Sequence, residues 1–394
     1  MKKSPAVREN TPLVGTTDRS SRAKTPGLPS LGETEGGYSL IVPGVATVAF
    51  DRDGRARSLY ENGFYYARGM DGRCVEKKWI NDRRHARELS PDENTRLRTR
   101  LSNIIESVQP FVKNKGLDLL QDFVSNRWET DGERFKSLWP SIGILPPDQY
   151  LALVLSVTDG CSWNQCSFCR FYKDRPFRVR SLAEVLQHTD EAIAFWGEGL
   201  QSRCSVFLGE ANAFQTKPPW LISLVETLKK KLPRLATPQS DGVGGVYAFA
   251  EAVSLIHWSV PELKALGQAG FRRAYVGVET GDDALRRTLR KPGTATLVLK
   301  GLTKLKEAGI NLGLMILLGP GGRSQNSAHV RATVELLKKS PLGPGDFLYF
   351  SPLRDTNSKD FSEEDRVRQR EQMESALPSR GERRALYDIN DFLY

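Results

Sequence analysis

The sequence predicts an α/β protein in which a parallel sheet, open or closed into a partial barrel, follows a small β-meander and a helical region. Two observations carry this prediction. From about residue 150, six strand-like segments alternate with helix-like segments over about 200 residues, and such alternation is typical of a parallel sheet. Before that point, Asp-Gly and Asn-Gly pairs separate short β-prone runs, which is the pattern of antiparallel hairpins.

The composition is that of a globular protein. Of its 394 residues, 57 are Lys or Arg and 47 are Asp or Glu, which gives a formal net charge of +10, and 39% are hydrophobic. No apolar run approaches the ~18 residues that cross a bilayer, and the first residues lack the hydrophobic stretch of a secretory signal. We therefore expect a cytoplasmic protein that does not associate with membranes. The moderate positive charge permits an acidic partner such as RNA but does not require one.

The N-terminal part of the chain divides into two expected regions. Residues 1–36 are rich in Gly, Pro, Ser and Thr without periodicity and are expected to be a disordered tail; a transit peptide is the alternative, which the acidic residues there disfavour. Residues 37–148 are expected to form the β-meander and a helical region of unknown role. The predicted hairpin turns lie at Asp53-Gly54, Asn62-Gly63 and Asp71-Gly72.

A helix is expected to begin near residue 90. Ser90 is suited to cap it, Pro91 fits its first turn, and Glu93 completes a capping box. The apolar residues that follow recur at helical spacing, which predicts one buried face; they are Leu97, Leu101, Ile104, Ile105 and Val108. The Arg-rich stretch of residues 83–100 is interpreted as a solvated helix face.

Residues 149–355 are expected to form the parallel α/β core. Its predicted strands are 151–157, 205–208, 246–250, 273–278, 311–318 and 346–350. The first is continuously apolar, as expected for a strand buried on both faces. Ligands of such sheets bind at the carboxyl ends of the strands. Residues 356–394 are expected to be a charged C-terminal extension whose last, more apolar residues can dock back on the body.

The cysteines point to a metal centre. An odd number of cysteines without a secretory signal does not make a disulfide framework, and Cys161, Cys166 and Cys169 fall within nine residues on a loop after the first buried strand. A closed zinc site needs a fourth ligand, which this loop lacks, whereas a [4Fe–4S] cluster bound by three cysteines keeps one iron open. We favour the cluster over zinc. Cys204 is interpreted as a buried small residue, and the role of Cys74 stays open.

The loop Cys161-Ser-Trp-Asn-Gln-Cys166-Ser-Phe-Cys169 resembles the cluster loop of radical S-adenosylmethionine (SAM) enzymes. Its C-x4-C-x2-C spacing is a variant of the commonest family spacing, C-x3-C-x2-C, and is similar to that of an uncharacterised branch. The resemblance covers about residues 150–350. It implies a radical SAM-type partial (βα)6 barrel with a [4Fe–4S] cluster and SAM as cofactors, the three cysteines as iron ligands, and Phe168 near the SAM adenine.

Two strand ends further along the chain resemble family motifs in the expected order. The resemblance implies that Gly209 and Glu210 meet the SAM amino group, and that Glu279 reaches the ribose hydroxyls or the amino-acid end. The alternatives are a simple β-to-α turn at Glu210 and an ion pair of Glu279 with Arg272 or Arg273.

The resemblance also implies an activity. A reduced cluster would cleave SAM to a 5′-deoxyadenosyl radical, which abstracts hydrogen from an unidentified substrate, and the electron would come from a donor such as flavodoxin or ferredoxin. The protein would be oxygen-sensitive. The substrate class stays open between a small metabolite, a peptide and RNA, and no catalytic residue is predicted. The alternative is a non-catalytic Fe–S or zinc module that binds RNA or a protein through its basic surface.

Overall fold

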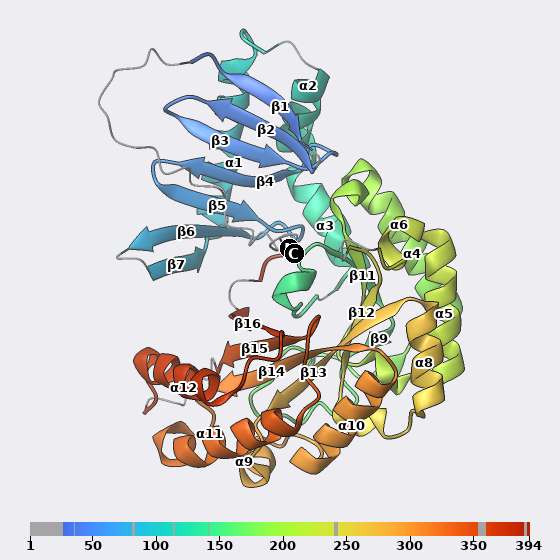
Figure 1. Ribbon diagram of the computed structural model, residues 1–394. Helices are drawn as coiled ribbons and strands as arrows, with labels where there is room; N and C mark the ends of the chain where they lie inside the picture. The colour runs from blue at the N-terminus through green and yellow to red at the C-terminus, as the bar shows by residue number, and fades with distance from the viewer. Residues whose placement is uncertain are drawn as a thin grey trace, which may run out of the picture.

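The computed structural model describes residues 27–34, 36–80, 83–112, 115–140, 142–239, 243–353, 360–389 and 392–394. Two seven-stranded sheets dominate it: an antiparallel sheet near the N-terminus and a parallel sheet after it. In Figure 1 the antiparallel sheet (blue) stands above the curved parallel sheet, whose helices lie along its outer side. The predicted order of a meander, helices and a parallel α/β region is confirmed.

The antiparallel sheet is a meander in which each strand pairs with its neighbours in sequence. Its strands are β1 (Ser30–Thr34), β2 (Gly37–Val42), β3 (Ala46–Phe50), β4 (Ala56–Glu61), β5 (Phe64–Arg68), β6 (Cys74–Ile80) and β7 (Arg83–Glu88). The three predicted turns join β3 to β4, β4 to β5 and β5 to β6, and Asn62 adopts the left-handed φ of 51° that suits an Asn-Gly turn. Because β1 pairs with β2, the expected boundary at residue 36 falls inside a hairpin. Residues 1–26 of the expected tail lie outside the described residues.

Helices cover one face of this sheet. They are α1 (Pro91–Val108), α2 (Lys115–Asp122) and α3 (Trp128–Leu138), with a π-helical turn (Phe123–Arg127) between the last two. The predicted capping box forms, since Glu93 N donates to Ser90 Oγ at 3.3 Å and Ser90 N donates to the Glu93 carboxylate at 2.9 Å. The predicted apolar stripe of α1 packs in one core with Leu40, Val48 and Leu59. The start of the Arg-rich stretch was expected in a helix but forms β7, where its backbone pairs with β6.

The parallel sheet has the order β16-β15-β14-β13-β12-β11-β8, and all six predicted strands are present. The strands are β8 (Ala152–Ser156), β11 (Ser205–Gly209), β12 (Val246–Ala250), β13 (Phe271–Glu279), β14 (Asn311–Leu318), β15 (Phe347–Pro352) and β16 (Arg383–Leu386). The main helices are α4 (Leu182–Trp196), α5 (Pro218–Lys231), α8 (Val260–Ala269), α9 (Asp283–Thr288), α10 (Ala295–Glu307), α11 (Gly322–Lys339) and α12 (Glu363–Ala376).

The C-terminal extension takes part in the parallel sheet, which the sequence did not predict. β16 pairs with β15 as a seventh strand. Further on, the Tyr394 hydroxyl donates to the carbonyl of Ala152 at 2.7 Å and accepts from the N–H of Val154 at 3.1 Å. Those groups belong to β8, the last strand in the sheet order, so a side chain satisfies its outer edge. The extension therefore adds a strand at one edge of the sheet and covers the other edge with the Tyr394 side chain.

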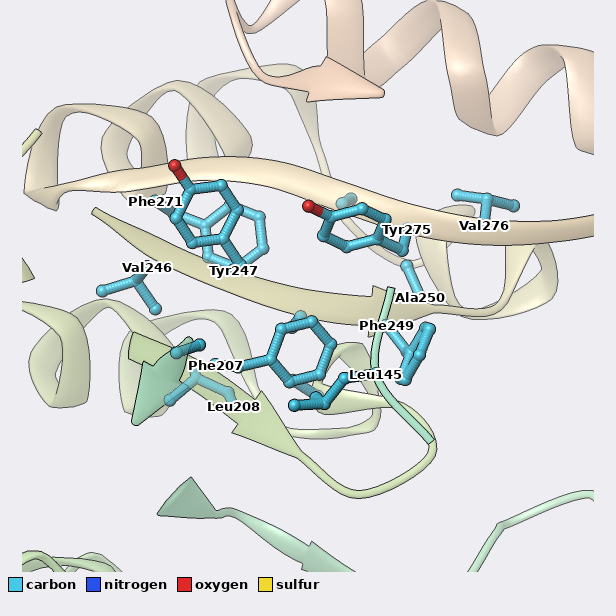
Figure 2. Close-up of a cluster of buried hydrophobic side chains, with 14 of the residues drawn as sticks. Leu145, Phe207, Leu208, Val246, Tyr247, Phe249, Ala250, Phe271, Tyr275 and Val276 are labelled. Atoms are coloured by element: carbon cyan, nitrogen blue, oxygen red, sulfur yellow. The ribbon is translucent and has the colours of Figure 1, made fainter. Parts of the chain in front are cut away.

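Aromatic side chains fill the inner side of the parallel sheet (Figure 2). The Phe207 ring lies 5.1 Å from Phe249 and 5.9 Å from Tyr275, between centroids. Gly313 provides the room for Tyr275, because a Cβ at Gly313 would stand 2.2 Å from that ring. The interior is thus a packed core, as in other barrels, which leaves the strand ends as the place for a ligand.

Residues 142–149 run along this inner side. Leu145 is buried among the aromatic residues. Asp148 accepts hydrogen bonds from the hydroxyls of Tyr275 and Tyr349, both at 2.6 Å, and from Arg273 at 2.7 Å. Because Arg273 lies near the start of β13, this network marks the amino side of the barrel.

A buried ion cluster joins the two sheets. Arg55, in the turn before β4, contacts the carboxylate of Asp131 on α3 at 3.0 Å and that of Asp53 at 2.9 Å. Its guanidinium also donates to the carbonyl of Phe195, at the end of α4, at 2.5 Å. Since breaking a buried ion pair is costly, this contact holds the N-terminal region against the barrel.

Candidate functional site

The cysteine loop leaves the carboxyl end of β8, as predicted. Its two stems form a short antiparallel ribbon, β9 (Thr158–Asp159) with β10 (Arg178–Val179). The loop is also bound to the turn after α9, since Ser167 N donates to Leu289 O at 3.0 Å and Trp163 Nε1 donates to Arg290 O at 2.7 Å. The three thiols therefore stand on a braced loop over the strand ends.

The three loop cysteines are free and partly buried. The N–H of Asn164 donates to Cys161 Sγ at 3.4 Å. Burial raises the pKa of Cys169, against a backbone hydrogen bond from Phe171 that lowers it, and burial raises the pKa of Cys166 to about 12. Cys166 and Cys169 are therefore thiols when no metal is bound, so iron would bind them with release of protons.

The donor set fits an iron–sulfur cluster better than a single ion. Three sulfur ligands on one loop, with amide donors beside them, have the chemistry that a cluster requires. Within the described ranges, no three His, Cys, Asp or Glu side chains come close enough to hold one metal ion. In a [4Fe–4S] cube each thiolate binds a different iron, so the three sulfurs need not converge on a point.

Phe168 faces the barrel side of the loop. It packs against the buried side chains of Leu285, Leu289 and Leu317. Leu317 lies at the carboxyl end of β14, so Phe168 connects the cysteine loop with that strand end. An aromatic ring there offers a flat apolar surface, which is compatible with the predicted adenine contact.

Gly209 and Glu210 lie at the carboxyl end of β11, beside the stem of the loop. The Glu210 carboxylate accepts from Gly160 N at 2.5 Å and from Arg175 Nε at 3.1 Å and Nη2 at 3.2 Å. Burial raises the pKa of Glu210, and these two donors oppose the rise. Glu210 is thus more than part of a β-to-α turn, because it joins the end of β11 to the cysteine loop.

Glu279, at the end of β13, is buried next to Lys291. Lys291 Nζ lies 2.5 Å from a carboxylate oxygen of Glu251 and 3.7 Å from one of Glu279. A Cβ at Gly277 would stand 2.3 Å from the Glu279 carboxylate and 3.0 Å from Lys291 Nζ, so only glycine leaves room for the pair. Its expected alternative partners, Arg272 and Arg273, do not bind Glu279; Arg273 bonds Asp148 instead.

The charges of Glu251, Glu279 and Lys291 affect one another's pKa values. Burial disfavours the charged form of Lys291, but Glu251 and Glu279 raise its pKa. Burial raises the pKa of Glu279, Lys291 lowers it, and Glu251 raises it. The Arg286 guanidinium also acts on both carboxylates, so two cations balance their charge. The Glu279 carboxylate, 3.7 Å from Lys291 Nζ, is suited to accept hydrogen bonds from a ligand.

Two buried side chains hold the loop that carries Glu279. Arg286 donates to the carbonyls of Val278 at 2.6 Å and Pro292 at 2.7 Å, on either side of α9. His329 on α11 bonds Leu317 O at 3.0 Å and Thr280 Oγ1 at 2.8 Å. Because a carbonyl only accepts, Nε2 of His329 carries the proton and Nδ1 accepts from Thr280.

Sequence reasoning missed Glu251, Lys291 and Arg175. One signal could have found Glu251, because it follows the end of β12 as Glu210 follows β11 and Glu279 ends β13. Lys291 comes from a turn after a short helix, and only the fold reveals that it reaches the strand ends.

The other two cysteines lie elsewhere. Cys74 is buried in the N-terminal core, with its thiol 3.1 Å from Asn94 Oδ1. Cys204 precedes β11, at the opposite end of the sheet from the cysteine loop, and is only partly buried.

The region of the chain that contains this site also matches a known protein family. Residues 155–337, from the end of β8 to α11, match the model of the Radical SAM superfamily. This region, just under half of the chain, belongs to the radical SAM superfamily. Membership of this superfamily implies an iron–sulfur cluster and SAM as cofactors. In the radical SAM region, the cysteine loop, Glu210 and Glu279 share one edge of the sheet.

The relatives of this radical SAM protein are distant. It is 25% identical over 229 residues to 4′-phospho-dehydrooxetanocin synthase of Priestia megaterium, a match that spans 54% of this chain and 30% of the relative. The chain thus spans less than a third of the curated relative it matches.

Solved radical SAM proteins are also similar. Methylornithine synthase gives a TM-score of 0.41 at 15% identity, covering 72% of this chain and 74% of the other. Coproporphyrinogen III oxidase of Escherichia coli gives 0.37 at 14%, covering 58% and 48%. Among the described residues, no helix is long and apolar enough to cross a membrane.

Proposed function

We propose that this radical SAM protein is an enzyme that cleaves SAM reductively and uses the resulting radical to abstract hydrogen from a substrate. We further propose that Cys161, Cys166 and Cys169 hold the [4Fe–4S] cluster. The observation that carries the proposal is the meeting of three free thiols with Glu210 and Glu279 at the carboxyl edge of one parallel sheet.

The bound cofactors would supply a 5′-deoxyadenosyl radical, and the chain supplies binding, orientation and exclusion of water. Glu210, oriented by Arg175, is proposed to accept hydrogen bonds from the ammonium group of SAM. Glu279, oriented by Lys291, is proposed to accept from the ribose hydroxyls. Phe168 is proposed to cover the adenine, and Gly209 is proposed to meet the SAM amino group beside Glu210.

The packed interior limits where the substrate can bind. Phe207, Phe249 and Tyr275 fill the middle of the barrel (Figure 2). A hydrogen atom to be abstracted must therefore be presented at the carboxyl edge, above these rings. The substrate class remains open between a small metabolite, a peptide and RNA.

The test uses the whole chain purified without oxygen and supplied with iron and sulfide. After reduction with dithionite and addition of SAM, 5′-deoxyadenosine is measured by chromatography together with the bound iron. We expect about four irons per chain and deoxyadenosine from the wild type. The variant C161A/C166A/C169A should lose both, whereas the matched control C74A/C204A should keep both.

Other outcomes would reject the proposal in distinct ways. A full iron content without SAM binding or cleavage would favour the non-catalytic module. If the protein retained only zinc under these conditions, the assignment of a [4Fe–4S] cluster would be wrong, and the radical reaction would be rejected with it. If the C74A/C204A control also lost its iron, the assignment of the three loop cysteines as the iron ligands would be rejected.

A further inference from the structure

One buried arginine is bonded to the backbone on both sides of the Glu279–Lys291 pair. Arg286, on the short helix α9, is 1% exposed. Its Nη1 donates to the carbonyls of Val278 at 2.6 Å and Thr280 at 3.3 Å. These carbonyls belong to the residues immediately before and after Glu279, so the guanidinium fixes the backbone that carries this carboxylate.

The same guanidinium also fixes the backbone beside Lys291. Nε of Arg286 donates to the carbonyl of Gly293 at 2.9 Å, and Nη2 donates to that of Pro292 at 2.7 Å. Pro292 and Gly293 follow Lys291 directly in the chain. Because a guanidinium is planar and its donors have a fixed geometry, these bonds set the separation between the backbone of Lys291 and that of Glu279.

The backbone of Glu279 has a conformation that needs such support. Its φ is 63°, in the left-handed region that residues with a Cβ rarely adopt. The pairing of β13 with β14 also shifts register between Gly277 and Glu279, as at a β-bulge, which changes the direction of a side chain. Conformations of this kind persist where the surrounding structure fixes them, and they are concentrated at functional sites.

We propose that Arg286 is a positioning residue for SAM binding, because it sets the direction of the Glu279 carboxylate and its 3.7 Å distance from Lys291 Nζ. This inference rests on the proposed function, in which Glu279 accepts from the ribose hydroxyls. Since Nε, Nη1 and Nη2 of Arg286 all donate to carbonyls, Arg286 acts through Glu279 and not by contact with the ligand.

A role confined to stability has a different consequence for binding. If Arg286 only stabilised the fold, its replacement would weaken SAM binding by the same factor with or without the carboxylate at position 279. If Arg286 acts by directing that carboxylate, the loss disappears when the carboxylate is absent. A double-variant cycle measures coupling of this kind between two residues.

The experiment measures the Kd for SAM by equilibrium dialysis without oxygen, on the whole chain supplied with iron and sulfide. R286K keeps the charge but lacks the planar fork of donors, and it is compared with E279Q, the double variant R286K/E279Q and the wild type. Chemical denaturation gives the free energy of unfolding of each. The matched control is R68K, because Arg68 is also buried, at 4% exposed, and donates to a carbonyl, that of Trp128, in the N-terminal region.

A second variant, G293A, moves one bonded carbonyl and leaves the arginine in place. Gly293 has a φ of 75°, and a Cβ there would stand 3.1 Å from a methyl carbon of Val253. An alanine at this position therefore displaces the carbonyl to which Nε of Arg286 donates. This variant tests the proposal even if R286K does not fold.

We expect the Kd for SAM to rise about tenfold in R286K, and to rise by a smaller factor in G293A. In the E279Q background, either change should raise the Kd by no more than about twofold. R68K should lose stability but bind SAM within about twofold of the wild type.

Three results would overturn the positioning role of Arg286. They are equal factors in the two backgrounds, an unchanged Kd in both R286K and G293A, and a loss of SAM binding in R68K as large as that in R286K. A wild type that binds its iron but no SAM would instead overturn the proposed function.

Discussion

The two ends of the parallel barrel contain similar buried charges arranged in opposite ways. On the amino side, both oxygens of Asp148 accept short hydrogen bonds, from two tyrosines and Arg273. On the carboxyl side, Lys291 bonds Glu251 at 2.5 Å but reaches Glu279 only at 3.7 Å, beyond hydrogen-bond distance. Both oxygens of Asp148 are thus engaged, although Arg273 Nε has no hydrogen-bond partner among the described residues, whereas Glu279 keeps acceptor capacity for a ligand.

This difference separates groups that stabilise the fold from groups available to function. Removing a buried carboxylate whose partners are complete destabilises the native state, because those partners then lack an acceptor and cannot reach water. A carboxylate with an incomplete shell costs stability and is retained where a ligand completes it. Substitutions at the amino side should therefore alter unfolding, and those at the carboxyl side should alter activity.

The largest effect is expected at Asp148. The variant D148A leaves the buried hydroxyls of Tyr275 and Tyr349 and the guanidinium of Arg273 without their acceptor. We expect the free energy of unfolding to fall by about 3 to 5 kcal/mol, measured by chemical denaturation. The control D190A breaks a surface pair with Lys231 and should cost less than about 1 kcal/mol. Similar losses in the two variants would contradict a special role of the amino-side network.

His329 lies on the carboxyl side, but both of its ring nitrogens have hydrogen-bond partners. It therefore tests whether a group with complete partners contributes to stability on this side too. Burial lowers its pKa to about 4, although its bond to Leu317 opposes the shift. The ordinary histidine pKa is higher, near 6.5, so the unfolded chain binds the proton more readily. The contribution to stability is complete above pH 6.5 and is lost as the pH falls towards 4. It amounts to at most about 3 kcal/mol.

Denaturation between pH 5.0 and 6.5 measures this loss, with H329Q for comparison. The wild type should lose stability across the window more steeply than H329Q. A second buried histidine, His188, whose pKa burial likewise lowers to about 4, should account for part of the slope that remains. Equal slopes in the wild type and H329Q would show that folding leaves the pKa of His329 unchanged.

Glu279 should show the reverse pattern, with a large effect on activity and a small one on stability. The variant E279Q keeps the side-chain volume and leaves Lys291 paired with Glu251. We expect SAM cleavage to fall about 100-fold, which corresponds to about 2.7 kcal/mol, while unfolding changes by less than about 1 kcal/mol. The control E226Q, on the outer face of α5, should change neither. If E279Q cleaved SAM as fast as the wild type, the proposed role of Glu279 in binding SAM would be wrong.

Much of the fold could be predicted because its signals are local. The capping box at Ser90, the Asn62-Gly63 turn and the apolar run of β8 each depend on neighbours in sequence. The spacing of Cys161, Cys166 and Cys169 is local too, which is why the loop identified the family. The strand at residues 83–88 was assigned to a helix because charge says little about backbone conformation when packing decides it.

The remaining features depend on contacts between distant parts of the chain. β16 is short and highly charged, and only its pairing with β15 makes it a strand. Lys291 joins the site through the position of α9, and Tyr394 reaches β8 from about 240 positions away in sequence. The partners proposed for Glu279 failed for a local reason. Arg273 lies near the other end of β13, about 20 Å from Glu279 along an extended strand, and bonds Asp148 there.

The smallest effect is expected at Arg175, which orients Glu210 on the carboxyl side. Arg175 lowers the pKa of Glu210 against the rise due to burial, so removing the guanidinium lets that pKa rise further. In R175M the carboxylate is protonated at a higher pH and binds an ammonium group less well. We expect the Kd for SAM to rise about tenfold, or about 1.4 kcal/mol, and more at pH 6 than at pH 8, measured by equilibrium dialysis without oxygen.

Arg178 supplies the control, because it pairs with Asp159 and Glu184 rather than with Glu210; R178M should bind SAM like the wild type. The double variant R175M/E210Q should bind no worse than E210Q, since Arg175 acts only through that carboxylate. Additive losses in the double variant would mean that Arg175 contacts SAM itself, and the carboxyl side would then contain a cationic binding group in addition to its acceptors.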